Sequence, residues 1–262
     1  LLLSLTKDSY EQFKHNTLLE IYVTEREWKK AVSMAEQLEK ISGVSLRKEI
    51  SHYYCEMAVS MILSKNINDA SKFLLHAIDE HKNCVRANIL LGDIHDSKGM
   101  IDEAVSYWRK IEYQKPEYLG LVASKIINSY QAQNKINEGL SILSRYYDLY
   151  NLKTLLNVLY EAVISNEGPK SAEKIARNEL IQRPSLLALD QLFQALAINK
   201  NTQIDNIELI QQTIKNSISI RRFYVCNSCG FKAKQFHWQC PACNSWESLP
   251  SEPKDVALDE IA

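Results

Sequence analysis

The residues best suited to chemistry are four cysteines near the C-terminal end of the chain. Cys226 and Cys229 form one Cys-x-x-Cys pair, and Cys240 and Cys243 form a second pair after ten intervening residues. Four thiolates at this spacing can reach one metal ion, and a tetrahedral set of four sulfurs suits zinc or iron. Because such a set leaves no open coordination position, we expect one iron or zinc ion with a structural rather than a hydrolytic role.

Each cysteine pair is followed by a residue that allows the chain to turn back sharply. The turn directs backbone N–H groups at the sulfurs and needs a left-handed conformation just after the second cysteine. Gly230 and Asn244 stand at these two positions, and both residue types tolerate that conformation. A segment of this size is too small to fold without its ion. The side chains predicted to form its small core are Val225, Phe231, Phe236, Trp238 and Trp246.

The other candidate groups for chemistry are expected to be structural. Cys55 and Cys84 lie singly inside helical patterns and are predicted to be small buried side chains. His95 stands where its repeat unit has an aromatic residue, and it is therefore predicted to be a packed core side chain rather than a metal ligand. No nucleophile with its base, glycine-rich phosphate loop or paired-acid site is recognisable. The clustered cysteines indicate a metal site in a reducing compartment rather than a disulfide framework. The sequence therefore predicts a protein that is not an enzyme.

The overall composition favours long helices and opposes nucleic-acid binding. Only 7 glycines and 6 prolines occur in 262 residues, too few for an all-β fold with many turns. The 31 basic and 32 acidic residues nearly cancel, so no global field attracts nucleic acid or an anionic membrane. The chain opens with Leu1-Leu2-Leu3-Ser4-Leu5 and no methionine, and we expect it to be a fragment whose N-terminal part is missing.

A repeat of about 34 residues organises the chain before the cysteines. Ala70 and Ala104 lie 34 residues apart, and Gly139 follows 35 residues after Ala104. This period is typical of tetratricopeptide repeats, in which pairs of helices stack on one another. Further units are predicted around 18–35 and 172–176, with a last helix pair over Leu186–Ile220 and a helix start at Pro169. The best-matched unit contains Leu91, Gly92, His95, Gly99, Ala104, Trp108 and Pro116.

These patterns predict an all-α fold, a tetratricopeptide-repeat superhelix (α-solenoid) with a small C-terminal domain in which four cysteines bind a metal ion. The predicted divisions are repeats over 1–220, the metal-binding domain over 221–249 and a disordered tail over 250–262. Stacked helix pairs create a groove that binds protein partners. The side chains expected to line that groove are His52, Arg86, Asp93 and Asp96.

This order of parts resembles the lipopolysaccharide assembly protein B family (LapB, also called YciM) of Gram-negative bacteria. The likeness runs along the whole chain, and the two cysteine pairs with their flanking aromatic residues are its most specific part. The stretches that carry it are Glu27-Trp28-Lys29-Lys30-Ala31, His52-Tyr53-Tyr54-Cys55-Glu56-Met57-Ala58, Tyr224-x-Cys226-x-x-Cys229-Gly230-Phe231 and Trp238-x-Cys240-Pro241-x-Cys243.

The resemblance implies a regulatory adaptor rather than a catalyst. It implies a single inner-membrane anchor in the missing N-terminal part, with this domain facing the cytoplasm and packing its rubredoxin-like module against the repeats. It also implies that the adaptor promotes degradation of the lipid A deacetylase LpxC by the membrane protease FtsH. Other lipopolysaccharide-assembly or regulatory membrane proteins are further expected partners, and nucleic acid is not.

Two alternatives follow from the metal-binding module. A one-iron centre of four sulfurs could transfer electrons, although a true rubredoxin has a glycine where Asn244 stands and a longer spacer between its cysteine pairs. A zinc ribbon could bind nucleic acid, but the basic side chains of the module are nearly balanced by four thiolates around a divalent ion. The choice between zinc and iron is left open.

Overall fold

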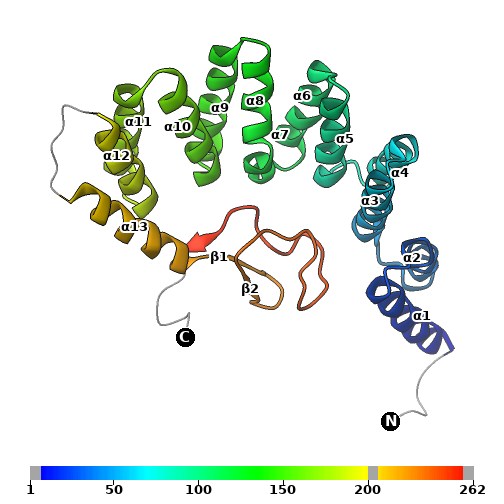
Figure 1. Ribbon diagram of the computed structural model, residues 1–262. Helices are drawn as coiled ribbons and strands as arrows, with labels where there is room; N and C mark the ends of the chain where they lie inside the picture. Colours follow the sequence, from blue (N-terminus) through cyan, green and yellow to red (C-terminus); the bar gives the residue numbers. More distant parts are fainter. Residues whose placement is uncertain (1–6, 200–205, 256–262) are drawn as a thin grey trace. The chain divides into compact units, whose positions relative to one another are not determined.

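The computed structural model describes residues 7–199 and 206–255 and is mainly helical (Figure 1). The predicted fold class is confirmed: the described residues form successive helix pairs and a small C-terminal module with four cysteines. None of the helices in these ranges combines the length and the apolar character needed to cross a membrane. The N-terminal leucine cluster lies outside the described residues.

The chain divides into two compact units, Leu1–Pro116 and Glu117–Ala262. The sequence predicts a division after residue 220 instead, whereas the structure groups the cysteine module with the helices from Glu117 onward. The helices described in the first unit are α1 (Lys7–Thr24), α2 (Trp28–Ser42), α3 (Arg47–Leu63), α4 (Ile67–Glu80), α5 (Val85–Ser97), α6 (Ile101–Arg109) and the short α7 (Ile111–Gln114).

Six of the helices described in the first unit form the pairs α1/α2, α3/α4 and α5/α6. Close approach within the third pair depends on Gly92, because a Cβ atom there would lie 2.2 Å from Nε1 of Trp108. Cys55 and Cys84 are fully buried in the core between α3, α4 and α5, with their sulfurs 3.8 Å apart. Their predicted role as small buried side chains is confirmed, and burial raises the pKa of the Cys55 thiol well above its usual value.

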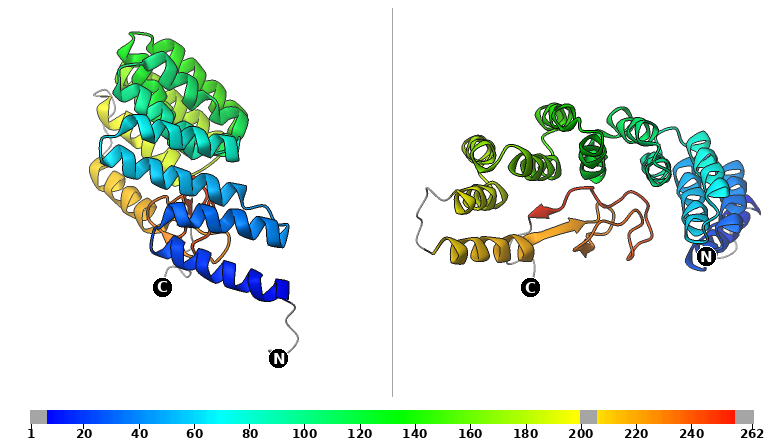
Figure 2. Two further views of the ribbon diagram at one scale, coloured as in Figure 1. Left: turned by 90° about the vertical axis from the view of Figure 1, so that its right-hand side faces the viewer. Right: turned by 45° about the horizontal axis from the view of Figure 1, so that its top comes forward.

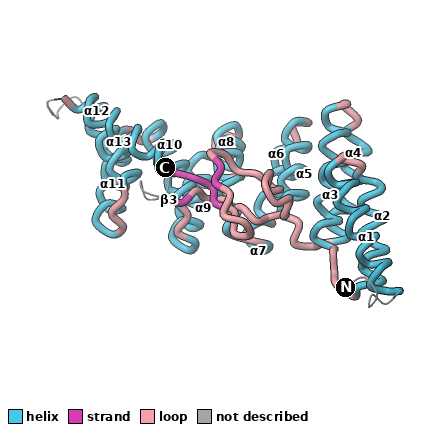
Figure 3. The backbone as a smooth tube through the Cα atoms, turned by 90° about the horizontal axis from the view of Figure 1, so that it is seen from below, coloured by secondary structure: helices cyan, strands magenta, loops and turns pink. Residues whose placement is uncertain are grey.

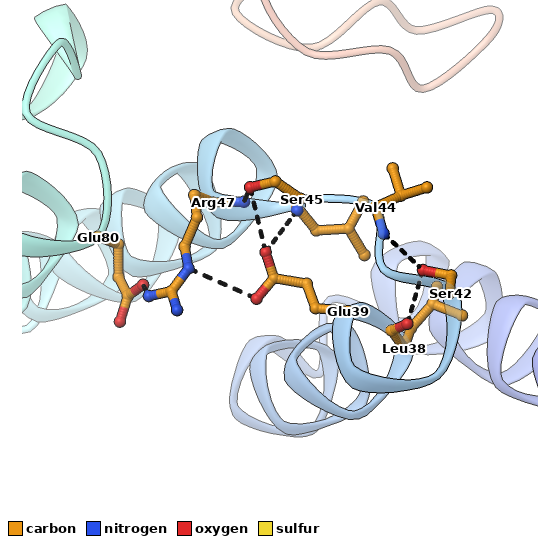
Figure 4. Close-up of polar contacts among 8 residues, drawn as sticks. Leu38, Glu39, Ser42, Val44, Ser45, Arg47 and Glu80 are labelled. Carbon is orange, nitrogen blue, oxygen red and sulfur yellow. Dashed lines mark hydrogen bonds and ion pairs between the residues drawn. The ribbon is translucent and has the colours of Figure 1, made fainter.

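The connection between α2 and α3 is fixed by a polar network (Figure 4). Oε1 of Glu39, near the end of α2, accepts a hydrogen bond from the backbone N–H of Leu46 at 2.6 Å. Its other oxygen lies 3.5 Å from Nε of Arg47, whose guanidinium also pairs with Glu80 at the end of α4. The left-handed Gly43 ends α2. The contacts of Glu39 and Arg47 thus tie α2, α3 and α4 together.

The four predicted groove residues lie in the first unit, and two of them are not on its surface. His52 is fully buried in α3. Arg86 is only 8% exposed, and its guanidinium pairs with Glu56 at 2.8 Å. Both side chains pack between helices, which corrects the expectation that they line an open groove. Asp93 is half-buried and Asp96 is exposed, and their role in partner binding stays a prediction.

The second unit continues the helix pairs with α8/α9, α10/α11 and α12/α13 (Figures 1 and 2). Pro169 is the first residue of α11, as predicted, and Ser185 caps α12 by accepting from the N–H of Ala188. The last pair occupies the predicted range. The bounds are η2 (a 3₁₀ helix, Pro116–Leu121), α8 (Ala123–Ala132), α9 (Ile136–Tyr150), α10 (Lys153–Asn166), α11 (Pro169–Gln182), α12 (Leu186–Ile198) and α13 (Ile207–Arg221).

Asp190 on α12 is a site where a neutral side chain should stabilise the second unit. Burial raises the pKa of its carboxyl, and the cation of Lys215 only partly offsets this effect. Ionised Asp190 therefore destabilises the folded state. This cost is absent below the unfolded pKa of about 4, grows as pH rises through the folded pKa and is complete above it.

We expect Asp190→Asn to raise the melting temperature by roughly 2–4 °C at pH 7. The gain should shrink toward zero near pH 4. Thermal melts at both pH values measure it, with Asp148→Asn on the exposed surface of α9 as the control. A gain of equal size at the two pH values would show that ionisation of Asp190 is not its cause.

Candidate metal centre

The four cysteines belong to a small module of short strands and loops that follows α13 (Figure 3). Strand β1 (Arg222–Val225) is central, and β2 (Lys232–Ala233) and β3 (Lys254–Asp255) pair with it on either side, both antiparallel. Tyr224 lies opposite Ala233, and Phe223 lies opposite Lys254. This sheet holds the first cysteine pair directly at the end of β1.

The two cysteine pairs have the same backbone geometry. In the first, the N–H of Gly230 donates to the carbonyl of Cys226 at 2.9 Å, and the N–H of Cys226 donates to the carbonyl of Phe231 at 2.8 Å. Gly230 is left-handed with φ of 76°, as the sequence predicts. The second pair repeats this arrangement fourteen residues later, with Asn244 at φ of 59° and two bonds of 2.9 Å, Asn244 N–H to Cys240 and Cys240 N–H to Ser245.

The sulfur positions fit a tetrahedral metal site. All four Sγ atoms lie within 4.8 Å of one another. The separations are 3.8 Å between Cys226 and Cys243 and 3.7 Å between Cys229 and Cys240. A zinc–sulfur bond of about 2.3 Å gives a tetrahedron edge of about 3.8 Å. The donor set therefore fits one zinc ion, and four thiolates are equally a donor set for iron.

The surroundings of the sulfurs favour thiolates at two positions. Burial opposes ionisation of Cys226, but the Ser248 hydroxyl and the N–H groups of Cys229 and Ser228 outweigh it and lower the pKa to about 6. The hydroxyl and N–H of Ser245 lower the pKa of Cys243.

The other two thiols ionise less easily without a cation. The N–H of Phe231 favours the thiolate of Cys229, but desolvation and the neighbouring cysteines raise its pKa to about 12. Desolvation likewise raises the pKa of Cys240, against the N–H groups of Cys243 and Ala242. Four sulfurs at this distance therefore need a cation to be ionised together.

The core of the module differs in part from the predicted one. Trp246 is 5% exposed, as expected of a core residue, but Phe231 is 36% exposed and lies outside it. Leu249 is fully buried and packs with Ala233 and the two buried cysteines, Cys226 and Cys240. The second cysteine of each pair, Cys229 or Cys243, is closer to solvent. Phe231 follows Gly230 on the exposed side of the first turn, which explains its position.

Two aromatic residues of the predicted core instead attach the module to the helices. The ring of Trp238 stacks on that of Tyr118 in η2, with centroids 5.4 Å apart, and Phe236 meets the same tyrosine edge to face at 6.2 Å. Tyr118 is 4% exposed, and this burial raises its pKa. The sequence pattern did not single out Tyr118, since nothing in its local spacing reports a partner more than a hundred residues away.

The segment after residue 249 continues the module instead of forming the predicted tail. Ser251 is 4% exposed, and its hydroxyl donates to the carbonyl of Glu117. Oε1 of Glu252 accepts from the N–H of Thr154 at 2.7 Å and from its hydroxyl at 2.6 Å. This carboxylate thus caps the start of α10, where a negative charge is favoured. The prediction of disorder from residue 250 is wrong up to Asp255, and 256–262 lie outside the described residues.

A lysine joins the module to the last helix. Nζ of Lys234 lies 2.6 Å from the carbonyl of Ser219 and 3.0 Å from that of Ile220, at the end of α13. It also lies 3.5 Å from the centre of the Phe223 ring. A cation is favoured at a helix C-terminus, where carbonyl groups lack helical partners. The module is thereby attached at η2, α10 and α13.

Thr154→Val should loosen the attachment of the module to α10. The substitution keeps the shape of the side chain and removes a hydroxyl that donates to a carboxylate, at an expected cost of about 1.5–3 kcal/mol. We expect faster hydrogen exchange in β3 and a lower urea midpoint. Thr213→Val is the control, because its hydroxyl bonds only within exposed α13, to Leu209. Equal exchange rates in the two variants would contradict the role given to Thr154.

Fold and site together define a class, a helical-repeat protein with a C-terminal four-cysteine module of the rubredoxin type. Residues 224–250 match the family described as Rubredoxin metal binding domain. The chain is 24% identical over 234 residues to Lipopolysaccharide assembly protein B of Escherichia coli (strain K12), covering 88% of this chain and 60% of that protein. It is 27% identical over 241 residues to the protein of the same name in Haemophilus influenzae, covering 88% and 59%.

The chain is a homologue of Lipopolysaccharide assembly protein B, and the resemblance predicted from the sequence is confirmed. It spans about 60% of the length of these curated relatives. Among solved structures, Pseudomonas aeruginosa PilF is similar with a TM-score of 0.45 and 10% identity, over 82% of this chain and 93% of that one.

Proposed function

We propose that this chain is the cytoplasmic part of an inner-membrane adaptor that regulates lipopolysaccharide synthesis. In this proposal it presents the lipid A deacetylase LpxC to the membrane protease FtsH, and a helix outside this sequence anchors it to the membrane. The observation that carries the proposal is the match to Lipopolysaccharide assembly protein B along 88% of the chain. The structure contributes a repeat scaffold whose helix pairs suit protein binding rather than catalysis.

The metal module serves in this proposal as a rigid part of the binding scaffold. Cys226, Cys229, Cys240 and Cys243 would hold the ion, which supplies a cross-link between the two cysteine turns. The chain's own residues then fix the module to the helices through Tyr118, Thr154 and Glu117. Loss of the ion would release these contacts together, because Trp238, Ser251 and Glu252 are positioned by the folded module.

Degradation of purified LpxC by FtsH, with and without this chain, tests the proposal. We expect the chain to accelerate degradation and Cys226→Ser to abolish the acceleration. Asn227→Ser is the matched control, since it places serine on the neighbouring exposed residue and leaves the sulfurs intact. If the wild-type chain neither binds the deacetylase nor changes its degradation, the proposed adaptor role is wrong for this part of the protein.

A second candidate function is electron transfer, favoured by the four-sulfur geometry and the exposed position of Cys229. Metal analysis of the purified chain separates the two functions. Iron with a reversible one-electron couple would support electron transfer. Zinc, or iron without such a couple, would leave a structural ion as the adaptor proposal requires.

A further inference from the structure

A groove of about 610 Å³ lies in the second unit between α9 and α11, with α10 as its floor. The floor is apolar and buried and is formed by Leu156, Leu159 and Val163. Residues of both walls recur every three to four positions along their helices, so one face of each helix lines the groove. On α11 the lining runs from Ser171 to Gln182, which corresponds to about 16 Å of helix.

The groove opens on the side of α10 that faces away from the metal module. Thr154 of α10 holds the module through Glu252. Leu156, Leu159 and Val163 follow Thr154 by two, five and nine residues, which places them roughly 180° around the helix axis from it. The module therefore occupies one face of the repeat layer in this unit and leaves the groove on the other face accessible.

A polar cluster closes one end of the groove. The hydroxyl of Tyr147 on α9 donates to Glu179 on α11 and accepts from Arg183 at 2.8 Å. Arg183 also lies 3.5 Å from Glu179, which is 9% exposed. Desolvation and the hydrogen bond to Glu179 raise the pKa of Tyr147, so the phenol stays protonated and keeps donating. These contacts hold the two wall helices at a fixed distance from each other.

The exposed rim of the groove carries an excess of negative charge. Asp148 lies at the end closed by the polar cluster, and Glu167 lies at the opposite end. Lys174 is the basic residue of the lining, and Arg183 is already paired with Glu179. The small side chains of Ser144 and Ser171 project little from the wall helices, so that another helix can approach the apolar floor.

We propose that this groove binds an amphipathic helical segment of a protein partner, with leucine-like side chains on the floor and lysine or arginine near both ends. The groove length fits about 8–11 residues of helix. An apolar face laid into a groove between helices is a common recognition mode. The acidic rim selects a basic segment and disfavours an anionic ligand such as a phosphate or a lipid headgroup.

Fluorescence anisotropy with a synthetic probe tests the groove directly. The probe is a labelled 14-residue peptide of leucine and lysine with leucines at helical spacing. The control is a peptide of the same composition in which leucine and lysine are arranged as closely as possible in strict alternation. We expect the helical peptide to bind more tightly than the control peptide. Ser144→Arg should weaken it roughly tenfold by filling the groove and adding a like charge. Ser165→Arg, at an exposed α10 position outside the lining, should leave binding unchanged.

A second variant keeps the test interpretable if Ser144→Arg does not fold. Asp148→Lys changes an exposed residue. It should weaken binding of the helical peptide and reduce the salt dependence of that binding. Binding that is the same in Ser144→Arg, Asp148→Lys and wild type would overturn the proposal, as would no binding up to about millimolar peptide. Because the probe is not the deacetylase, this experiment can refute the groove proposal without refuting the adaptor proposal, and the degradation assay can do the reverse.

Discussion

Cys240→Ser is expected to unfold the metal module while the helix pairs of the first unit stay folded. Cys240 is fully buried and packs with Leu249 and Ala233, so its loss removes one metal ligand and disturbs the module core together. Structural zinc sites supply apparent binding free energies of about 10–16 kcal/mol in zinc-finger peptides, far more than a core of this size. Removing one ligand should therefore unfold the module.

Hydrogen exchange and metal analysis measure this effect. We expect the variant to lose its ion and residues 222–255 to lose protection, along with Tyr118 and the first turn of α10, which the module covers. Chelation of the wild-type ion should give the same pattern. Asn227→Ser should keep full metal content. A variant that retained one equivalent of metal and normal protection would show that three sulfurs suffice and that the fourth is not needed for folding.

Local features of the site could be predicted from the sequence because each depends on neighbouring residues. The left-handed residues Gly230 and Asn244 follow from the geometry of a turn that directs N–H groups at sulfur. The start of α11 at Pro169 follows from the missing N–H of proline. The range of the last helix pair follows from the period of the repeat. In each case the information lies within one turn or one repeat.

The attachment of the module to the helices could not be predicted in the same way. Thr154 and Glu252 are 98 residues apart, and Glu117 and Ser251 are 134 apart. Neither pair has a period or a spacing that reports its contact. The proline and acidic residues after residue 249 have the composition of a disordered tail. Their order comes from tertiary contacts with η2 and α10, which composition does not encode.

The predicted groove residues show a related limit. A repeat pattern indicates which positions face a neighbouring helix. Whether a given side chain is buried or exposed also depends on how successive helix pairs pack. His52 and Arg86 have polar side chains but lie in buried stretches of α3 and α5, Arg86 with Glu56 as its partner. The groove between α9 and α11 was missed for the converse reason, because Ser144 and Ser171 have no chemical signature as wall residues.

Gly92→Ala is expected to destabilise the first unit by about 2 kcal/mol, in spite of the better helix propensity of alanine. The new Cβ would lie 2.2 Å from Nε1 and 2.5 Å from Cδ1 of Trp108, far inside contact distance. Trp108 is 1% exposed, and its Nε1 donates to the carbonyl of Ile89 at 3.3 Å, so the ring has no free space to enter. Overpacking of this kind typically costs about 1–3 kcal/mol.

A double-mutant cycle tests whether Trp108 is the cause. In a Trp108→Leu background the clash is removed, and Gly92→Ala should then stabilise α5 by up to about 1 kcal/mol through helix propensity alone. Urea denaturation of the four proteins gives both values. The sign of the Gly92→Ala effect should therefore reverse between the two backgrounds. The same destabilisation in both would mean that the glycine is required by the backbone of α5 and not by the approach of α6.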